Sequence, residues 1–343
     1  MSSAPVCTPA KLVATQTSLV NNFAQSAGLP VPLSLYLFND CGAPVLNAQA
    51  GVDFSNGDPS LTLIPVGPGG IYWGTWTPLN ASSQVVVSTR ATAPGFSTTT
   101  TQVTGQVTGS SVPILTAGGT VHVFDSVVGA ALSPGTIVEI YGSNFANQST
   151  AASTVPLPIS LGGASVTIGG YPAPLYYAGP SQIDAEIPTE LAPGGVYQVV
   201  VTSGGGQSTP GSIATAAVSP GIAAYGNGAA IAQHADYSLV TEASPAAPGE
   251  YIVIYLSGMG LTNDTVADGA ASPSNPLGQP LVAPTLTFNG SSIPIYFSGL
   301  TPGYVGLYQT NFQVPASIPN GDISLVVSQN GSASNSTILP VHN

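Results

Sequence analysis

Residue types that could do chemistry are few and scattered in this chain. Charged side chains make up only 5% of the 343 residues, which include three histidines and two cysteines. His234 and Asp236 are separated by one residue and would share one face of a strand, as a metal pair or a base with its orienting acid requires. Neither Gly-x-Ser-x-Gly nor His-Glu-x-x-His occurs. We therefore expect hydrogen bonding in a turn or on the surface for this pair, and we predict that the chain is not an enzyme.

Acidic side chains at two other places are candidates for binding calcium. Asp264 and Asp268 follow the turn at residues 258–261, and loop oxygens are the ligands that calcium prefers. Asp184 and Glu186 alternate on one face of a predicted strand. Because the spacing of an EF-hand or of a nonapeptide repeat is absent, we interpret all these acids as solvated side chains. The sequence predicts no metal site and no cofactor, with Asp264 and Asp268 as weak calcium candidates.

Aromatic side chains in one strand offer a different chemistry, the stacking of a sugar ring. Trp73 and Trp76 fall beside Tyr72 in the segment IYWGTWTP. If both tryptophans were exposed, they could form a platform for a carbohydrate. In a β-sandwich, however, one tryptophan of such a strand commonly packs into the core. The pair Trp73 and Trp76 is therefore a candidate ligand-stacking site, with core packing as the alternative.

The two cysteines, Cys7 and Cys41, allow one intramolecular bridge. A disulfide between them would close a loop of about 34 residues and stabilise the fold by about 3 kcal/mol. Two buried free thiols are the alternative, but we favour the disulfide because other features indicate an extracellular setting. The opening residues MSSAPVC lack the basic start and apolar stretch of a secretory signal. We expect an extracellular or cell-surface protein whose signal peptide is not present in this chain.

The overall composition favours β-strands and excludes several classes of partner. Helix formers are scarce, and the 41 glycines and 32 prolines recur at intervals that would break most helices. Apolar residues occur in runs of about four to eight, whereas a membrane helix needs about 20. Lys11 and Arg90 stand against 14 acidic residues, which gives a net charge of -12. We expect an all-β chain that neither binds nucleic acid nor inserts into a membrane.

Turn residues divide the first third of the chain into short strands. The alternation then fades in the threonine-rich run at residues 98–101, and we place a domain boundary near residue 110. The expected strands lie at residues 33–38, 45–54, 61–66, 71–78 and 84–91.

The remaining two thirds of the chain contain an internal repeat. The segment PGTIVEIYG at residues 134–142 matches PGEYIVIYL at residues 248–256. Further on, VTIGGYPAPLYYAG at residues 166–179 matches LTFNGSSIPIYFSG at residues 286–299. The strand cores align while the loops differ in length, which is typical of two copies of one sandwich. We therefore predict tandem immunoglobulin-like β-sandwiches, with domains at residues 1–110, 111–219 and 220–343.

Three segments of the repeat carry a family likeness: SPGTIVEIYGSNF, ASVTIGGYPAPLYYAGPSQIDAEIP and PGEYIVIYLSGMG. Over residues 115–343 the chain resembles the C-terminal domain found in secreted proteins of the Solibacter group of acidobacteria, a family without an assigned function. The opening PGTIVEIYGSNF also resembles the start of IPT/TIG immunoglobulin-like domains of surface receptors and adhesins. The N-terminal part, with FNDCGAPV and GGIYWGTWTP, is similar to bacterial Ig-like modules. These resemblances imply an Ig-like array outside a bacterium, and they imply no catalytic residues.

Strand alternation predicts which side chains of the repeat face the core. The matched strands at residues 136–141 and 250–255 should occupy the same sheet position in the two copies. We expect Val138 and Ile140 in the first copy, and Ile252 and Ile254 in the second copy, to point inward.

The opposite face of the second copy is a candidate self-association face, formed by Tyr251, Val253 and Tyr255. The first copy has a charge there, at Glu139, which the second copy lacks. Interface cores are enriched in aromatic residues and depleted in charges, so this face could bind another copy. The alternative is that the loop at residues 270–282 covers it. A terminal segment could also add a strand to the sheet of a neighbouring copy, because few charges guard its edges.

Two functions of different classes fit these observations. The first is a structural protein that polymerises with itself: a subunit of a fibre, sheath or surface layer, or an adhesin stalk. The near-absence of charge and the tandem sandwiches favour this function. The alternative is a secreted module that binds a polysaccharide or a surface partner through its loops or through Trp73 and Trp76.

Overall fold

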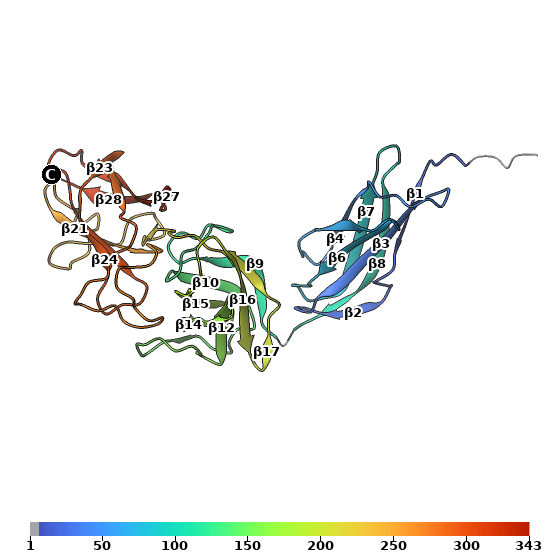
Figure 1. Cartoon of the computed structure of the whole chain (residues 1–343), viewed down its shortest axis with the longest axis horizontal. Coiled ribbons are helices and arrows are strands. Elements are labelled where there is room, and N and C mark those ends of the chain that lie inside the picture. The colour runs from blue at the N-terminus through green and yellow to red at the C-terminus, as the bar shows by residue number, and fades with distance from the viewer. Residues whose placement is uncertain (1–6, 111, 343) are drawn as a thin grey trace, which may run out of the picture. The chain divides into compact units, whose positions relative to one another are not determined.

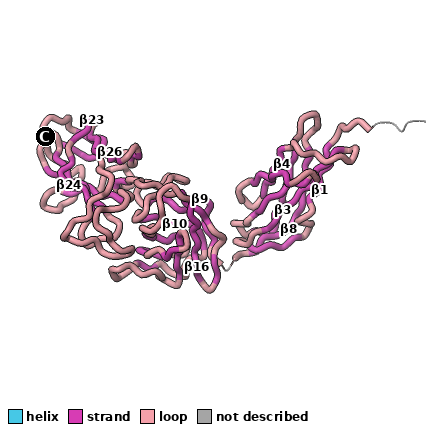
Figure 2. The backbone as a smooth tube through the Cα atoms, viewed as in Figure 1, coloured by secondary structure: helices cyan, strands magenta, loops and turns pink. Residues whose placement is uncertain are grey.

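The chain folds into strands joined by turns and loops, in two compact units, Met1–Ile114 and Leu115–Asn343 (Figures 1 and 2). The structure is a computed structural model that describes residues 7–110 and 112–342. These described residues contain only β-strands as regular elements, and no helix among them is long and apolar enough to cross a membrane. The fold class is therefore all-β, with tandem immunoglobulin-like sandwiches.

The first unit is a sandwich in which one strand links the two sheets. Strand β5 pairs with β4 on one side and with β6 on the other, so that the path β1-β3-β6-β5-β4-β7-β8-β2 is continuous. Tyr72, Leu35 and Val87 belong to the core that both sheets enclose. The strands are β1 (Leu12–Gln16), β2 (Phe23–Ser26), β3 (Val31–Asn39), β4 (Gln49–Phe54), β5 (Leu61–Val66), β6 (Ile71–Trp76), β7 (Ser82–Thr92) and β8 (Thr99–Thr108).

The threonine-rich run does not mark the end of the regular structure, contrary to our expectation. It begins β8, a strand of 10 residues that pairs with β7 from Ala91 back to Ser82. Threonine is β-branched and suits a pleated strand, and Val107 anchors the end of β8 in the core. The polar composition of the run therefore reflects one solvent-facing side of a strand.

The second unit contains two sandwiches, each with its own hydrophobic core. We call the one built from β9 to β18 the middle sandwich and the one built from β19 to β28 the C-terminal sandwich (Figure 1). The strands of the middle sandwich are β9 (Ile114–His122), β10 (Ile137–Ser143), β11 (Thr150–Ala151), β12 (Ala164–Ile168), β13 (Tyr171–Pro172), β14 (Leu175–Ala178), β15 (Gln182–Glu186), β16 (Val196–Ser203), β17 (Gly206–Gln207) and β18 (Gly211–Ala214). Those of the C-terminal sandwich are β19 (Gly221–Ile222), β20 (Ala232–Gln233), β21 (Tyr251–Ser257), β22 (Thr285–Phe288), β23 (Ser291–Ile293), β24 (Ile295–Leu300), β25 (Tyr308–Gln313), β26 (Gly321–Gln329), β27 (Ser332–Ala333) and β28 (Thr337–Val341).

The strand order is the same in the two sandwiches. One sheet runs β14-β15-β10-β9 in the middle sandwich and β24-β25-β21-β19 in the C-terminal sandwich. The other sheet runs β13-β12-β16-β17 and β23-β22-β26-β27, with β18 and β28 added to β16 and β26. This agreement accounts for the internal repeat of the sequence. Val138, Ile140, Ile252 and Ile254 are all fully buried, as the alternation predicted.

Candidate functional site

A cluster of polar contacts in the second unit lies between its two sandwiches, at what we call the junction. Glu186 ends β15 of the middle sandwich and is only 5% exposed. Its Oε2 accepts a hydrogen bond from the backbone N–H of Gly269 at 2.5 Å. Asp268 accepts hydrogen bonds from the backbone N–H and from Oγ1 of Thr189, at 3.2 and 2.7 Å. Each sandwich thus supplies one carboxylate that the other sandwich binds.

Burial changes the acidity of Glu186. Removal of its carboxyl from water raises its pKa to about 8, because the charged form is poorly solvated there. The N–H of Gly269 opposes this shift, whereas the charges of Asp268 and Glu190 add to it. The sequence predicts solvated side chains for Glu186 and Asp268. This was wrong, because the two sandwiches pack over them.

Uncharged groups complete the junction. The hydroxyl of Tyr176 donates to the carbonyl of Val305 at 2.7 Å and accepts from its N–H at 3.2 Å. Ser133 Oγ donates to the carbonyl of Gly258 at 3.0 Å. Ser257 Oγ accepts from the N–H of Ile137 at 3.2 Å. These groups are buried or partly buried, so water reaches them poorly. Each hydrogen bond replaces the bond to water that the polar atom lost on burial.

Glycines allow the two sandwiches to approach closely. A Cβ on Gly258 would lie 2.7 Å from Nε2 of His122 in the middle sandwich, and one on Gly306 would lie 2.7 Å from Cδ1 of Ile137. Both glycines also have positive φ values, which L-residues with a side chain rarely adopt. A side chain at either position would therefore push the sandwiches apart.

His122, the last residue of β9, is buried at the same junction. Its Nδ1 accepts hydrogen bonds from the backbone N–H groups of Phe124 and Asp125, at 2.9 and 3.2 Å. The ring fills the space next to Gly221 and Gly258, where a Cβ would lie within 3 Å of it. Burial lowers its pKa to about 4, against a smaller opposite effect of the Ser257 backbone. His122 is thus a neutral packing residue at neutral pH.

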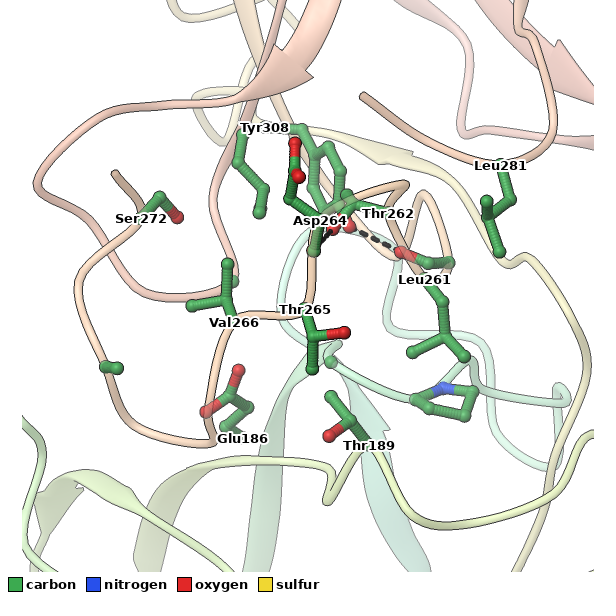
Figure 3. Close-up of a pocket in the computed structure, with 16 residues that line it drawn as sticks. Glu186, Thr189, Leu261, Thr262, Asp264, Thr265, Val266, Ser272, Leu281 and Tyr308 are labelled. Atoms are coloured by element: carbon green, nitrogen blue, oxygen red, sulfur yellow. Dashed lines mark hydrogen bonds between the residues drawn. The ribbon is translucent and has the colours of Figure 1, made fainter. Parts of the chain in front are cut away.

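A cavity of about 190 Å³ adjoins the junction (Figure 3). Its lining combines the carboxylates of Glu186 and Asp264 with hydroxyls such as those of Thr189 and Thr265 and with apolar side chains. Thr262 Oγ1 donates to the backbone carbonyl of Asp264 at 2.6 Å, which holds the loop over the cavity. The arrangement offers hydrogen-bond acceptors and hydroxyls to a small polar molecule.

The two weak calcium candidates serve different contacts. Asp264 lines the cavity, whereas Asp268 binds Thr189 and is absent from the lining. Both side chains are half-buried rather than solvated. Throughout residues 7–110 and 112–342, no group of three or more His, Cys, Asp or Glu side chains could hold a metal ion.

The candidate self-association face lies on the outer side of β21. Tyr251 is 49% exposed, and its ring meets that of Tyr296 edge-on, with centroids 5.2 Å apart. Val253 and Tyr255 are half-buried, and the Tyr255 hydroxyl donates to Gln233 Oε1 at 2.5 Å. This leaves Tyr251 and Tyr296 as the accessible aromatic part of the face.

The loop at residues 270–282 does not cover Tyr251. Its Gly278 accepts a hydrogen bond from the N–H of Leu300, at the end of β24. Tyr251, in β21, keeps about half of its surface. The loop therefore leaves Tyr251 accessible.

The equivalent positions of the two sandwiches differ in chemistry. Ile137 pairs with Glu186 in the middle sandwich, and the equivalent pair in the C-terminal sandwich is Tyr251 with Gln313. The C-terminal sandwich thus has the amide of Gln313 where the middle sandwich has the carboxyl of Glu186. The two following pairs are Glu139 with Asp184 and Tyr141 with Gln182, equivalent to Val253 with Asn311 and Tyr255 with Gln309.

The two tryptophans of β6 have different environments. Trp76 is 3% exposed, stacks on Phe54 with ring centroids 4.5 Å apart, and donates its indole N–H to Asp58 Oδ2 at 2.9 Å. Trp73 is 45% exposed, with Ser34 and Ile64 as its cross-strand neighbours. The pair therefore cannot form a common platform, because alternation along β6 points Trp76 into the core. Only Trp73 is available for stacking.

His234 and Asp236 are not partners. They lie in the turn after β20. The backbone N–H of His234 donates to the backbone carbonyl of Ser238, and the carboxylate of Asp236 accepts from the hydroxyl of Ser238 at 2.6 Å. The imidazole Nδ1 of His234 lies 2.5 Å from Oε1 of Glu250. Partial burial is the largest single influence and lowers the pKa of His234, but the hydrogen bonds to Glu250 and to the Ser244 backbone, together with the charges of Glu250 and Asp236, outweigh it and the net shift is upward. Both residues thus form hydrogen bonds in a turn, as expected, and His234 also pairs with Glu250.

Cys7 and Cys41 form a disulfide in the structure, with their Cα atoms 5.8 Å apart. The bond ties the segment before β1 to the turn after β3. The turn is held further by Asp40, whose Oδ1 accepts from the N–H of Ala10 at 2.9 Å. Residues 1–6, part of the terminal segment that could add a strand to another copy, lie outside the described residues.

Three residues with structural roles were not singled out from the sequence. Asp58 is buried and accepts hydrogen bonds from Trp76 and from the N–H groups of Leu79 and Asn80. Its place in an Asn-Gly-Asp-Pro turn is a usable signal, because Asp side chains often bind backbone N–H groups near turns. Thr189 carries no comparable signal, because its partner Asp268 lies 79 residues away. His122 carries none for its burial, because the glycines against which its ring packs are also distant in the sequence.

Known proteins resemble parts of this chain or its general fold. Residues 123–215 match the IPT/TIG domain model. No curated protein matches the chain. Similar solved structures include a Bacteroides ovatus mixed-linkage glucan utilization locus protein, SGBP-B, in complex with a mixed-linkage heptasaccharide. It has 13% identity over 94% of this chain and 67% of that chain, with a TM-score of 0.38.

Two further solved structures are similar at a comparable level. A bacterial ice-binding adhesin has 14% identity over 97% of this chain and 98% of that chain, with a TM-score of 0.22. Fibronectin(III)-like modules of Clostridium thermocellum CbhA have 15% identity over 59% of this chain and 92% of that chain, with a TM-score of 0.23. The domain match lies within the middle sandwich, so the chain contains an IPT/TIG domain at residues 123–215.

Proposed function

We propose that this chain is an extracellular structural protein that assembles with itself, as a subunit of a fibre, sheath or surface layer or as part of an adhesin stalk. The observation that carries the proposal is the junction. Glu186 and Asp268 are each bound by the opposite sandwich, and close glycine contacts accompany them. Such an interface makes two sandwiches one stiff element, which is what a stalk or fibre requires.

The composition supports the same function. Charged side chains are 5% of the chain, so copies that carry a net charge of -12 repel one another mainly through a few acids. The IPT/TIG match and the disulfide support an extracellular role. We retain domain boundaries near residues 110 and 219, and the likeness to the C-terminal domain of secreted Solibacter-group proteins, as parts of this proposal.

Assembly of the purified chain tests this function. Sedimentation velocity over a wide concentration range should show mass that grows with concentration, and negative-stain microscopy of the concentrated protein should show linear polymers or sheets. A chain that stays monomeric in both measurements would contradict a self-assembling role.

A second candidate function is binding of a neutral polysaccharide through Trp73. Its indole is 45% exposed on an outer sheet face beside Ile64, and an exposed indole can stack on a sugar ring. Affinity electrophoresis in gels that contain soluble glucans tests it. Retarded migration that Trp73→Ala abolishes would support this function, and unretarded migration of the unmodified chain in all glucans would exclude it for those polymers.

A further inference from the structure

The two sandwiches of the second unit expose the same structural position to different extents. In the middle sandwich this position is the pair Ile137 and Glu186, which are 8% and 5% exposed. In the C-terminal sandwich it is the pair Tyr251 and Gln313, where Tyr251 is 49% exposed. The difference arises because the C-terminal sandwich packs on Ile137 and Glu186. No further sandwich among the described residues packs on Tyr251 and Gln313.

The contacts that cover the first pair come from one end of the following sandwich. Ser257, the last residue of β21, accepts a hydrogen bond from the N–H of Ile137, and Gly306 lies against the Ile137 side chain. Gly269, from the loop after β21, donates to Glu186. The contact is therefore head-to-tail: the C-terminal end of β21 meets the N-terminal end of β10.

The exposed pair has a chemistry that suits an interface. Tyr296 packs against Tyr251, and its hydroxyl donates to Gln313 Oε1 at 3.3 Å. Gln313 also donates to the carbonyl of Gly249 at 2.8 Å. Aromatic rings with amides and without charge can be covered at little desolvation cost, in contrast to a charged carboxylate.

The chain also has a surface equivalent to the one that covers Ile137 and Glu186. In the middle sandwich the residues equivalent to 257–263 and 306–308 are 143–149 and 179–181, by the repeat and the strand pairing. Ser143, Asn147, Gln148 and Ser181 of these segments are exposed and uncharged. The repeat therefore provides both halves of a second head-to-tail contact, one at each end.

We propose that the Tyr251 and Gln313 end of the C-terminal sandwich binds the 143–149 and 179–181 end of the middle sandwich in a second copy of this chain. This inference rests on the proposed self-assembly and names its contact. The new contact uses the same two ends as the junction, with Ser143 of one copy near Tyr251 of the next, as Ser257 lies beside Ile137, but with a wider spacing because Asn144 stands where the junction has Gly258. Because the two surfaces differ, the contact is heterologous and extends into a fibre unless its rotation closes a ring.

Cysteine cross-linking tests the geometry directly. Chains that carry Tyr251→Cys and chains that carry Ser143→Cys are mixed and treated with a short bismaleimide, with the native disulfide left oxidised. We expect covalent dimers in the mixture at a yield several times that of either chain alone. The control pairs Tyr171→Cys, an exposed residue of β13, with Ser143→Cys. Equal yields in the two mixtures would overturn the proposed contact.

A charge substitution tests whether the contact drives assembly. Tyr251→Glu places an acid at an exposed site and should raise the concentration needed for assembly about tenfold or more, whereas Tyr171→Glu should leave it unchanged. If the unmodified chain assembles and Tyr251→Glu assembles equally well, the proposed contact is wrong and the self-assembly function stands. If the unmodified chain remains monomeric, both are wrong. Binding of a glucan that Tyr251→Glu abolishes, without assembly, would instead assign the face to a polysaccharide.

Discussion

The backbone N–H of Gly269 donates to the carboxylate of Glu186, 83 residues earlier in the chain, at 2.5 Å. This bond joins two sandwiches with separate hydrophobic cores. It also fixes a carboxyl in a place where its charge is poorly solvated, close to Asp268 and Glu190. Tyr176 and Tyr308 face the same carboxyl, and neither supplies a positive charge. The junction should therefore be sensitive to pH.

The first prediction concerns Glu186. Its folded pKa of about 8 lies above the ordinary value of 4.5, so the folded state binds more protons than the unfolded state between these values. The free energy of unfolding of the second unit should therefore fall as pH rises from 4.5 to about 8. Glu186 alone should contribute up to about 1.4 kcal/mol per pH unit to this fall. Glu186→Gln should remove that part of the fall and make the unit more stable than the unmodified chain at pH 8.

Calorimetry of the full chain can measure this effect. Both tryptophans lie in the first unit, so tryptophan fluorescence shows which calorimetric transition is the unfolding of the first unit. The remaining transition is then assigned to the second unit. Glu242→Gln, at an exposed glutamate, is the matched control and should keep the pH dependence of the unmodified chain. Parallel pH profiles of the unmodified chain and Glu186→Gln would show that Glu186 does not titrate as expected.

The second prediction concerns His122, whose pKa burial lowers to about 4 from 6.5. Here the unfolded state binds more protons between these values, so the second unit should lose stability as pH falls through this window. His122→Asn keeps an acceptor near Nδ1 and removes the titration. It should lower stability at pH 7 by about 1 to 3 kcal/mol, because it leaves a small cavity.

The pH profile separates these two effects of His122→Asn. Relative to the unmodified chain, the loss of stability should shrink as pH falls from 6.5 toward 4. Between about pH 4.5 and 6.5 the opposite slopes of His122 and Glu186 should nearly cancel in the unmodified chain. If the difference in unfolding free energy between His122→Asn and the unmodified chain did not change with pH, His122 would be protonated as easily in the folded state as in the unfolded state.

The third prediction concerns the disulfide between Cys7 and Cys41. It closes a loop across a sequence separation of 34, so its removal should destabilise the first unit by about 3 kcal/mol. The double variant Cys7→Ser with Cys41→Ser should unfold at lower urea concentration by tryptophan fluorescence. The transition of the second unit, which lacks cysteine, serves as the internal control and should not move.

The fourth prediction separates the two tryptophans of β6. Trp76→Ala removes a buried ring and leaves Asp58 without its indole partner, so it should cost the first unit about 3 to 5 kcal/mol. Trp73→Ala removes an exposed ring and should change stability by about 0.5 kcal/mol or less. Urea unfolding of the two variants, each followed by circular dichroism, measures both. Similar losses would mean that Trp73 is also a core residue.

The sequence was sufficient for the features that depend on local pattern. Alternation identified Val138 and Ile140 as inward-facing, and the repeat led to two sandwiches with one strand order. The environments of Glu186 and Asp268 were mispredicted, because their burial depends on a neighbouring sandwich rather than on their own strands. Trp73 and Trp76 shared one candidate role until the register of β6 showed which of them points into the core.

The close approach at Gly258 has a mechanical consequence. Chain segments that link folded modules usually bear any tension between them alone. Here Ser133 binds Gly258 and Ile137 binds Ser257, so two hydrogen bonds outside the connection from β18 to β19 also hold the sandwiches together. A pulling force along the second unit would have to shear these contacts before it could stretch the connection, so the two sandwiches should yield together.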